Sequence, residues 1–296
     1  RQFAQFAHVP VLDPATPEEA YLMTKAAFEI SEAHHLPVIL RPTTRVDHGC
    51  ASIDVPDDIL SLPRHEMAGF AKSPDFVIFP SLSRAAHERM THELETISQE
   101  FASSEFNKLD EYVRDDYELF LGIACSGDSR GYTLEALERL QAAAAAQGTE
   151  LPSYRLGTPY PFPERLGRDF LLGLSDALVI EELEPVVERS LLEMTGPVAA
   201  DAYITSCPTT VHGRLDGTTP ICGEYSADML VPVIAEFLGV SELAQACLPE
   251  SVEVPGDLVP PRPAVLCAGC PHRASFTAVK EAAHGKNIVY SGDIGC

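Results

Sequence analysis

The sequence predicts an α/β protein in which helices cover both faces of a parallel sheet. Short apolar runs alternate with helical segments in three stretches, at residues 9–42, 118–182 and 264–290. Apolar runs of this length predict buried strands, and the helical segments between them predict crossovers. This alternation is typical of a parallel sheet with helices on both faces.

Residues 9–42 are expected to form a strand, a helix and a second strand. Thr16 is the expected N-cap of the helix, and Pro17 suits its first position. The apolar run at 36–42 is ended by Pro42, which favours a buried strand. The positions spaced for the buried helical face are Met23, Ala26, Ala27 and Ile30.

Residues 57–113 differ in character, because they hold a long polar stretch of helical composition, and we expect them to connect two domains. A second α/β unit follows. Gly148 is the expected end of its alanine-rich helix, because glycine is favoured just past a helix C-terminus. The expected elements are strands at 118–125 and 177–182, an extended stretch at 151–157, and helices at 131–148 and 161–174.

The last part of the chain is expected to hold two further helices separated by a linker. Residues 226–239 predict a short helix, in which Pro232 should lie in the early turns or cause a kink. Five prolines between Pro249 and Pro263 predict the linker. After it we expect a strand at 264–266, a helix at about 271–284 and a strand at 287–290.

Composition excludes several classes of protein. The 296 residues carry a net charge of −23 with acidic residues spread along the chain, which argues against a nucleic-acid partner. No stretch approaches the roughly 20 apolar residues of a membrane helix. Eight cysteines are too few for a disulfide scaffold, and no signal-peptide pattern is present, so we expect a cytoplasmic protein.

Cys267 and Cys270 form a Cys-x-x-Cys pair at the start of an expected helix, and Gly269 gives their turn the freedom it needs. Three alternatives stay open: ligands of a metal or cluster, a redox dithiol, or two structural thiols. Cys296 follows the next expected strand. Loops at the carboxyl ends of two strands can therefore bring three sulfurs together.

Seven motifs occur in order along the chain, ending with LCAGCPHRASF at 266–276 and SGDIGC at 291–296. The five before them are VILRPTTRVDH, NKLDEY, GIACSGDSRGYTLEAL, RLGTPYPFPE and ALVIEELEPVVE. Together they resemble the large α subunit of the indolepyruvate:ferredoxin oxidoreductases, within the thiamine diphosphate-dependent 2-oxoacid:ferredoxin oxidoreductases. The resemblance covers essentially the whole chain.

The resemblance implies a division into domains of α/β fold. The end of a pyrimidine-binding domain and the start of a thiamine diphosphate-binding domain would flank a transketolase C-terminal-like domain. The implied ranges are 1–56 for the end of the pyrimidine-binding domain, 57–113 for a helical connector, 114–205 for the transketolase C-terminal-like domain, 206–262 for a second connector with a short helix and the proline-rich linker, and 263–296 for the start of the thiamine diphosphate-binding domain.

The resemblance also implies a cluster site in the last domain. Cys267, Cys270 and Cys296 match three of the four cysteines that hold a [4Fe-4S] cluster in the wider superfamily. His272 takes the place of a glutamate that lies beside the cofactor in pyruvate-type relatives, so it is the candidate catalytic residue. The alternative for His272 is an exposed histidine at a helix start.

Four neighbouring residues are candidates for cofactor binding. Arg273 would neutralise the charge of a substrate carboxylate or of the cluster, and a surface arginine is the alternative. Gly292, Asp293 and Gly295 make a tight turn after the last expected strand. Such turns bind ligands in α/β folds, and an ordinary turn is the alternative.

The implied activity is oxidative decarboxylation of an aryl pyruvate such as indolepyruvate to an acyl-coenzyme A. The implied cofactors are thiamine diphosphate with Mg²⁺ and a [4Fe-4S] cluster, and coenzyme A is a co-substrate. The implied partners are ferredoxin and a smaller β subunit in a hetero-oligomer. Two rivals stay open: an oxidoreductase for another 2-oxoacid, and a non-catalytic zinc-thiolate or transketolase-like interaction domain.

Three further polar segments follow expected strands. SGDSRGY at 126–132 resembles a glycine-bearing turn into a helix, but it matches neither G-x-G-x-x-G nor the phosphate-loop pattern. Three carboxylates follow the apolar run ALVI at 177–180: Glu181, Glu182 and Glu184. They either raise one another's pKa or favour a helix start. Five polar residues follow the apolar run that ends at Leu40: Arg41, Thr43, Thr44, Arg45 and His48. They either contact a ligand or another domain, or hydrogen-bond within their own loop.

The chain opens at Arg1 without a methionine and stops at Cys296 directly after an expected strand, so we expect a piece of a longer protein. The resemblance places the glutamate that activates the cofactor before Arg1 and the metal-binding motif after Cys296. We therefore predict that the 296-residue chain alone is inactive. Turnover of indolepyruvate by the isolated chain, assayed with thiamine diphosphate, coenzyme A and ferredoxin, would contradict this prediction.

Overall fold

The computed structural model describes residues 1–54, 77, 79–112, 121–152, 154–157, 162–195, 209–250, 266 and 268–291. The chain divides into two compact units, Arg1–Pro249 and Glu250–Cys296, and the boundary falls at the start of the predicted proline-rich linker. Within the described ranges, no helix combines the length and the apolar character that crossing a membrane requires.

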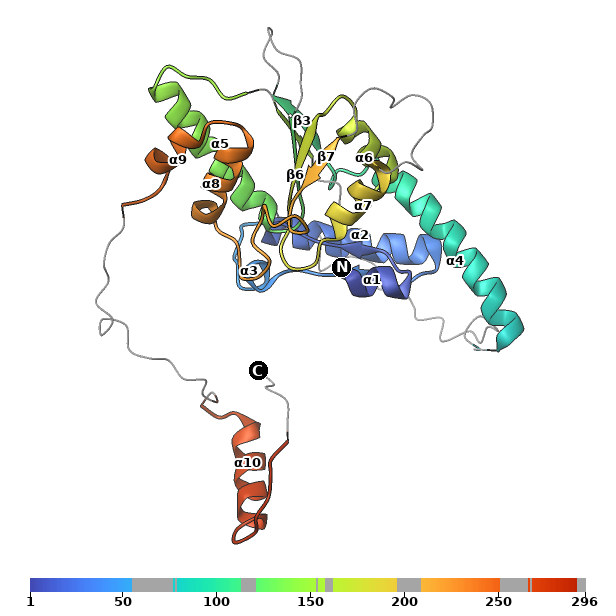
Figure 1. The fold of residues 1–296 in the computed structure, drawn as a ribbon. Coiled ribbons are helices and arrows are strands. Elements are labelled where there is room, and N and C mark those ends of the chain that lie inside the picture. The colour runs from blue at the N-terminus through green and yellow to red at the C-terminus, as the bar shows by residue number, and fades with distance from the viewer. Residues whose placement is uncertain are drawn as a thin grey trace. The chain divides into compact units, whose positions relative to one another are not determined.

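The larger unit is built on a five-stranded sheet in the order β3-β5-β4-β6-β7 (Figure 1). Strands β5, β4, β6 and β7 run parallel, and β3 pairs antiparallel with β5 at one edge. The sheet confirms the predicted α/β class. The strands are β3 (Leu109–Tyr112), β4 (Leu121–Cys125), β5 (Tyr154–Gly157), β6 (Asp176–Ile180) and β7 (Thr210–His212).

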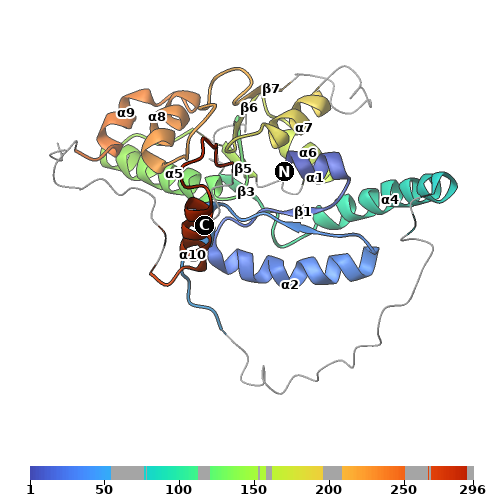
Figure 2. The ribbon, with the colours of Figure 1, turned by 90° about the horizontal axis from the view of Figure 1, so that it is seen from below.

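Helices cover both faces of this sheet, as Figures 1 and 2 show. On one side lie α5 (Ser129–Ala146), α8 (Ala227–Phe237) and α9 (Ser241–Cys247), and on the other α6 (Glu164–Leu171) and α7 (Val186–Thr195). Ile123, Cys125 and Leu178 pack on the α5 side, and Ala124 and Val179 on the α6 side. Burial raises the pKa of the Cys125 thiol to about 12.

Both predicted connectors contribute to the larger unit. The first supplies β3 to the sheet, and the second supplies β7, α8 and α9. Leu230, Val231 and Ile234 of α8 are fully buried in the core that includes α5. Because burial of these apolar side chains is favourable, α8 packs against the sheet unit. Ser226 caps α8, and Pro232 lies inside the helix.

The first 50 residues form the predicted strand, helix, strand unit. β1 (Val11–Leu12) and β2 (Ile39–Leu40) pair in parallel, and α2 (Pro17–His34) connects them. Thr16 caps α2 by accepting a hydrogen bond from the Glu19 N–H at 3.2 Å. Met23 is buried with Ile97 and Phe101 of α4 (Pro80–Phe101). Two short helices flank this unit, α1 (Gln2–Ala7) and α3 (Thr44–Asp47).

The smaller unit contains α10 (Pro271–Ala282), which confirms the predicted helix. Residues 287–290, which we predicted as a strand, have no strand pairing in the part of this unit that the structure describes. A strand forms only where a neighbouring backbone supplies its hydrogen bonds, and apolar composition alone does not provide that neighbour.

His34, in the last turn of α2, bridges two carboxylates of α4. Its Nδ1 lies 2.8 Å from Glu93 Oε2, and its Nε2 lies 3.0 Å from Glu100 Oε2. The hydrogen bonds with these carboxylates, that of Glu93 first, raise the pKa of His34. The contact therefore stabilises the fold fully below the pKa of the unfolded histidine and is lost as pH rises through the higher folded pKa.

We expect His34→Gln to lower the free energy of unfolding at about pH 5.5 by about 1 kcal/mol or less, as for partly exposed ion pairs, and by less at about pH 8.5. Urea unfolding followed by circular dichroism at both pH values measures the difference. In a Glu93→Gln, Glu100→Gln background, the effect of His34→Gln should lose its pH dependence. A pH dependence that persists in that background would argue against this contact.

Candidate functional site

The carboxyl-terminal edge of the sheet gathers the polar segments that follow β4 and β6. Ser126, Gly127 and Asp128 come directly after β4, and Glu181 and Glu182 come directly after β6. Since β4 and β6 are parallel neighbours, the two segments lie at the same edge. Ligands of parallel α/β sheets bind outside the carboxyl ends of the strands.

The strand, helix, strand unit meets the sheet at this edge. Arg41 follows β2, and its Nη1 donates to Oδ1 of Asp13, which follows β1, at 3.0 Å. Gly127 has φ +57°, and a Cβ at this position would lie 2.8 Å from Asp13 Oδ2. Only glycine therefore lets the turn after β4 approach Asp13 this closely.

The guanidinium of Arg1 joins the strand, helix, strand unit to the five-stranded sheet. Nη1 of Arg1 donates to Ser126 Oγ at 2.6 Å and to Glu181 Oε2 at 3.0 Å, and it lies 3.9 Å from Asp13 Oδ2. The other terminal nitrogen donates to the carbonyl of Glu182. The side chains of Arg1, Asp13 and Glu181 are 3%, 0% and 1% exposed. Two buried carboxylates from different layers thus share one buried cation.

Burial decides how these carboxyls titrate. It raises the pKa of Glu181, while Arg1 and the N–H groups of Val187 and Glu188 at the start of α7 act in the opposite direction. Burial also raises the pKa of Asp13, against two guanidiniums that lower it. Loss of the shared cation would leave carboxylates in a site that already disfavours their charge.

A cavity of about 590 Å³ opens beside this network, between the loop after β2 and the segments that follow β4 and β6. Its volume is within the range of small-molecule pockets. The loop supplies one wall through the five polar residues that the sequence indicated: Arg41, Thr43, Thr44, Arg45 and His48. All three polar segments of the sequence analysis therefore reach one cavity, although Glu181 and Glu184 are not among its lining residues.

The opposite wall of the cavity is acidic. Asp128 is 6% exposed, and no donor among the described residues reaches its Oδ2. Glu182 accepts a hydrogen bond from the Tyr225 N–H at 2.6 Å, and burial raises the pKa of Glu182. Glu224 pairs with Arg45 at 2.5 Å, and both side chains are more than half exposed. The cavity therefore offers cationic groups on one wall and carboxylates on the other.

Leu183 lines the cavity in an unusual backbone conformation. Its φ is +63°, and the residue is 52% exposed. The left-handed region costs an ordinary residue about 1–2 kcal/mol, and residues held there cluster at binding sites.

Three participants at this edge were missed by the sequence analysis: Arg1, Asp13 and Glu224. Asp13 carried a usable signal, because an acidic residue directly after an apolar strand must lie beside Arg41 once the two strands are parallel neighbours. Glu224 carried none, since only the path of the loop before α8 brings it to the cavity.

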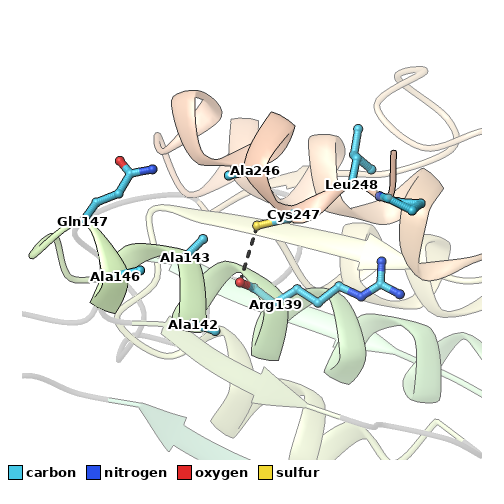
Figure 3. Close-up of a pocket in the computed structure, with 9 residues that line it drawn as sticks. Arg139, Ala142, Ala143, Ala146, Gln147, Ala246, Cys247 and Leu248 are labelled. Carbon is cyan, nitrogen blue, oxygen red and sulfur yellow. Dashed lines mark hydrogen bonds between the residues drawn. The ribbon is translucent and has the colours of Figure 1, made fainter. Parts of the chain in front are cut away.

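A second hollow, of about 520 Å³, lies between α5 and α9 (Figure 3). The alanine run of α5 forms one side, and the end of α9 forms the other. The Cys247 thiol donates to the Arg139 carbonyl at 3.4 Å, and burial raises the pKa of this thiol. The guanidinium of Arg139 already pairs with Glu135 and Asp228. The walls are largely methyl groups, so this hollow offers little for chemistry.

In the smaller unit, Cys270 is the N-cap residue of α10, and its Sγ lies 3.3 Å from Nδ1 of His272. Gly269, at φ +77°, makes the tight turn before it. Arg273 donates from Nη2 to the Leu266 carbonyl at 3.0 Å. Cys270 thus lies at the start of a 12-residue helix, and cysteine sulfur is the ligand that iron–sulfur clusters take.

The other predicted site residues, Cys267, Gly292, Asp293, Gly295 and Cys296, lie outside the described residues. In the part of the chain that the structure describes, no three His, Cys, Asp or Glu side chains form a group that could hold a metal ion. The ligand set of a cluster therefore stays a prediction.

The chain is similar along its whole length to known proteins. It is 37% identical over 303 residues to "Indolepyruvate oxidoreductase subunit IorA" of Methanothermobacter thermautotrophicus, and the alignment includes 100% of this chain. The chain is therefore similar, over its full length, to part of the A subunits of indolepyruvate oxidoreductases. The IorA protein of Thermococcus kodakarensis is likewise 37% identical, over 302 residues. The chain spans 44% and 43% of the lengths of these two relatives.

No family model matches the chain. Among solved structures, a 2-oxoglutarate:ferredoxin oxidoreductase from Magnetococcus marinus aligns with 55% of it, over 24% of that chain, at a TM-score of 0.34 and 17% identity. A split-gene transketolase aligns with 79% of it, over 58% of that chain, at a TM-score of 0.36 and 15% identity. These structural likenesses are too slight to carry an argument.

We expect Arg1→Met to lower the free energy of unfolding by about 3–5 kcal/mol, as for removal of one partner from a buried ion pair. Urea unfolding followed by circular dichroism measures the loss. Adding Glu181→Gln to Arg1→Met should recover part of it, because a neutral amide is less costly to bury than a carboxylate.

Arg45→Met is the matched control for this prediction. Its guanidinium also pairs with a carboxylate, that of Glu224, but the pair is exposed, so we expect little change in the unfolding midpoint. Equal losses for Arg1→Met and Arg45→Met would show that burial of the first pair does not matter.

Proposed function

We propose that this chain is part of the large subunit of an indolepyruvate:ferredoxin oxidoreductase, which oxidatively decarboxylates aryl pyruvates to acyl-coenzyme A. The observation that supports the proposal most is the 37% identity, along the whole chain, to an indolepyruvate oxidoreductase subunit. The chain spans 44% of that relative, so the proposed activity is that of the assembled protein.

The proposed cofactors are thiamine diphosphate with Mg²⁺ and a [4Fe-4S] cluster. Thiamine diphosphate supplies an electron sink for the loss of carbon dioxide. Cys267, Cys270 and Cys296 would hold the cluster, and the position of Cys270 at the positive end of α10 fits this role. Residues 292–295 would contact the thiamine diphosphate.

Two residues of α10 would serve the reaction directly. His272 would hold or transfer a proton or shape the pocket, and its contact with the Cys270 sulfur supports a place beside the cluster. Arg273 would neutralise negative charge on the substrate or the cluster. Ferredoxin would accept the electrons, coenzyme A would take the acyl group, and a smaller β subunit would complete a cytoplasmic hetero-oligomer.

Anaerobic purification of the full-length subunit with its partner, followed by iron, sulfide and zinc analysis, tests the cluster. We expect Cys270→Ala to remove about the four irons of one cluster per subunit and to abolish electron transfer to ferredoxin. Cys222→Ala is the matched control, because that thiol is also free, and it is exposed and in the other compact unit. The Cys222→Ala protein should keep its iron.

Three outcomes of these measurements would argue against the proposal. Stoichiometric zinc without iron would favour a structural zinc-thiolate domain. Unchanged iron in Cys270→Ala would remove Cys270 from the ligand set. Turnover of a different 2-oxoacid, with none of indolepyruvate, would favour an oxidoreductase of other specificity.

A further inference from the structure

An exposed ion pair links two walls of the cavity at the sheet edge. Arg45, on the loop after β2, pairs with Glu224, on the loop before α8, at 2.5 Å. Their side chains are 64% and 52% exposed, so a molecule that enters the cavity can reach both charged groups. An exposed pair is held weakly, because water solvates each partner well. A ligand that carries one charge of each sign can therefore replace this contact.

The charges that line the cavity nearly balance. Apart from one histidine, the charged residues of the lining are Arg41, Arg45, Asp128, Glu182 and Glu224. A ligand with only a negative charge would be repelled by the carboxylates, and a ligand with only a positive charge would be repelled by the guanidiniums. Such like-charge contacts select against the wrong ligand. The lining therefore favours a molecule that is neutral overall and carries two separated charges.

The same cavity has apolar surface. Pro42 and Leu183 line it, one on the loop after β2 and the other directly after Glu182. Leu183 is 52% exposed, and its backbone is held at φ +63°. Small-molecule sites combine apolar walls with a few polar groups that set orientation. An amino acid with an apolar side chain matches this combination, since its ammonium and carboxylate groups share one carbon atom and its side chain extends away from both.

We propose that the cavity binds a free α-amino acid with an apolar or aromatic side chain. The ligand carboxylate accepts hydrogen bonds from the Arg45 guanidinium, and the ligand ammonium donates to the Glu224 carboxylate, in place of the contact between these two side chains. Pro42 and Leu183 contact the ligand side chain. The ligand is bound without reacting, so the inference goes beyond the proposed function and does not depend on it.

Isothermal titration calorimetry of the assembled full-length protein tests the inference with three probes of similar size. They are L-phenylalanine, 2-phenylethylamine, which lacks the carboxylate, and 3-phenylpropanoate, which lacks the ammonium. We expect L-phenylalanine to bind roughly tenfold more tightly than either, because each single-charge probe leaves one side chain of the separated pair without a partner. No binding of L-phenylalanine, or equally tight binding of a single-charge probe, would overturn the inference.

Two variants distinguish direct contact from a general effect on the cavity. Arg45→Met should weaken the binding of L-phenylalanine by roughly tenfold without weakening that of 2-phenylethylamine, which has no carboxylate to lose a partner. Glu224→Gln should likewise weaken the binding of L-phenylalanine without weakening that of 3-phenylpropanoate. Binding of L-phenylalanine that survives both substitutions would place the ligand elsewhere in the protein and overturn the inference.

Arg139→Met is the matched control. Arg139 also pairs with about half-exposed carboxylates, those of Glu135 and Asp228, but it lines the hollow between α5 and α9. This substitution should leave the affinity for L-phenylalanine unchanged. Equal losses of affinity in Arg139→Met and Arg45→Met would show that overall charge, and not contact in the cavity, controls binding, and would also overturn the inference.

Discussion

The buried guanidinium of Arg1 is the interaction on which the arrangement of the larger unit depends. It lies between Asp13, at the end of β1, and Glu181, at the end of β6, so it fixes two separately formed sheets against each other. Such a cluster is stable only when each carboxylate has further donors. Arg41 supplies one to Asp13, and the first turn of α7 supplies two to Glu181.

The position of the cavity follows from this network. Arg41 forms the ion pair with Asp13 and also lines the cavity. The contact that holds Asp13 in the buried network therefore also fixes the position of the loop after β2. Gly127 does the same for the other wall, since it lies between Ser126, a partner of Arg1, and Asp128, which lines the cavity. Rigid strands and helices thus fix the position of the site, and loops supply the side chains that line it, as in other parallel α/β folds.

Local signals predicted most of the fold, and contacts between distant segments explain what they missed. Thr16 and the apolar run of β4 are local features, and both predictions are confirmed. β3 and β7 were not expected as strands, because edge strands of four and three residues have little apolar pattern of their own. The site residues Asp13 and Arg1 depend on pairing across the fold, whereas the polar segments at 41–48, 126–132 and 181–182 were visible because each directly follows a strand.

The burial of Cys125 has a consequence for the behaviour of this protein in air. Oxidants attack the thiolate, and a thiol with a pKa of about 12 and no exposed surface is neither ionised at neutral pH nor reachable. Cys50 and Cys222 are exposed. Oxidation of the larger unit should therefore begin at its exposed cysteines. Cys125 in β4 should stay reduced, so that the central sheet keeps its structure after the exposed thiols have been oxidised.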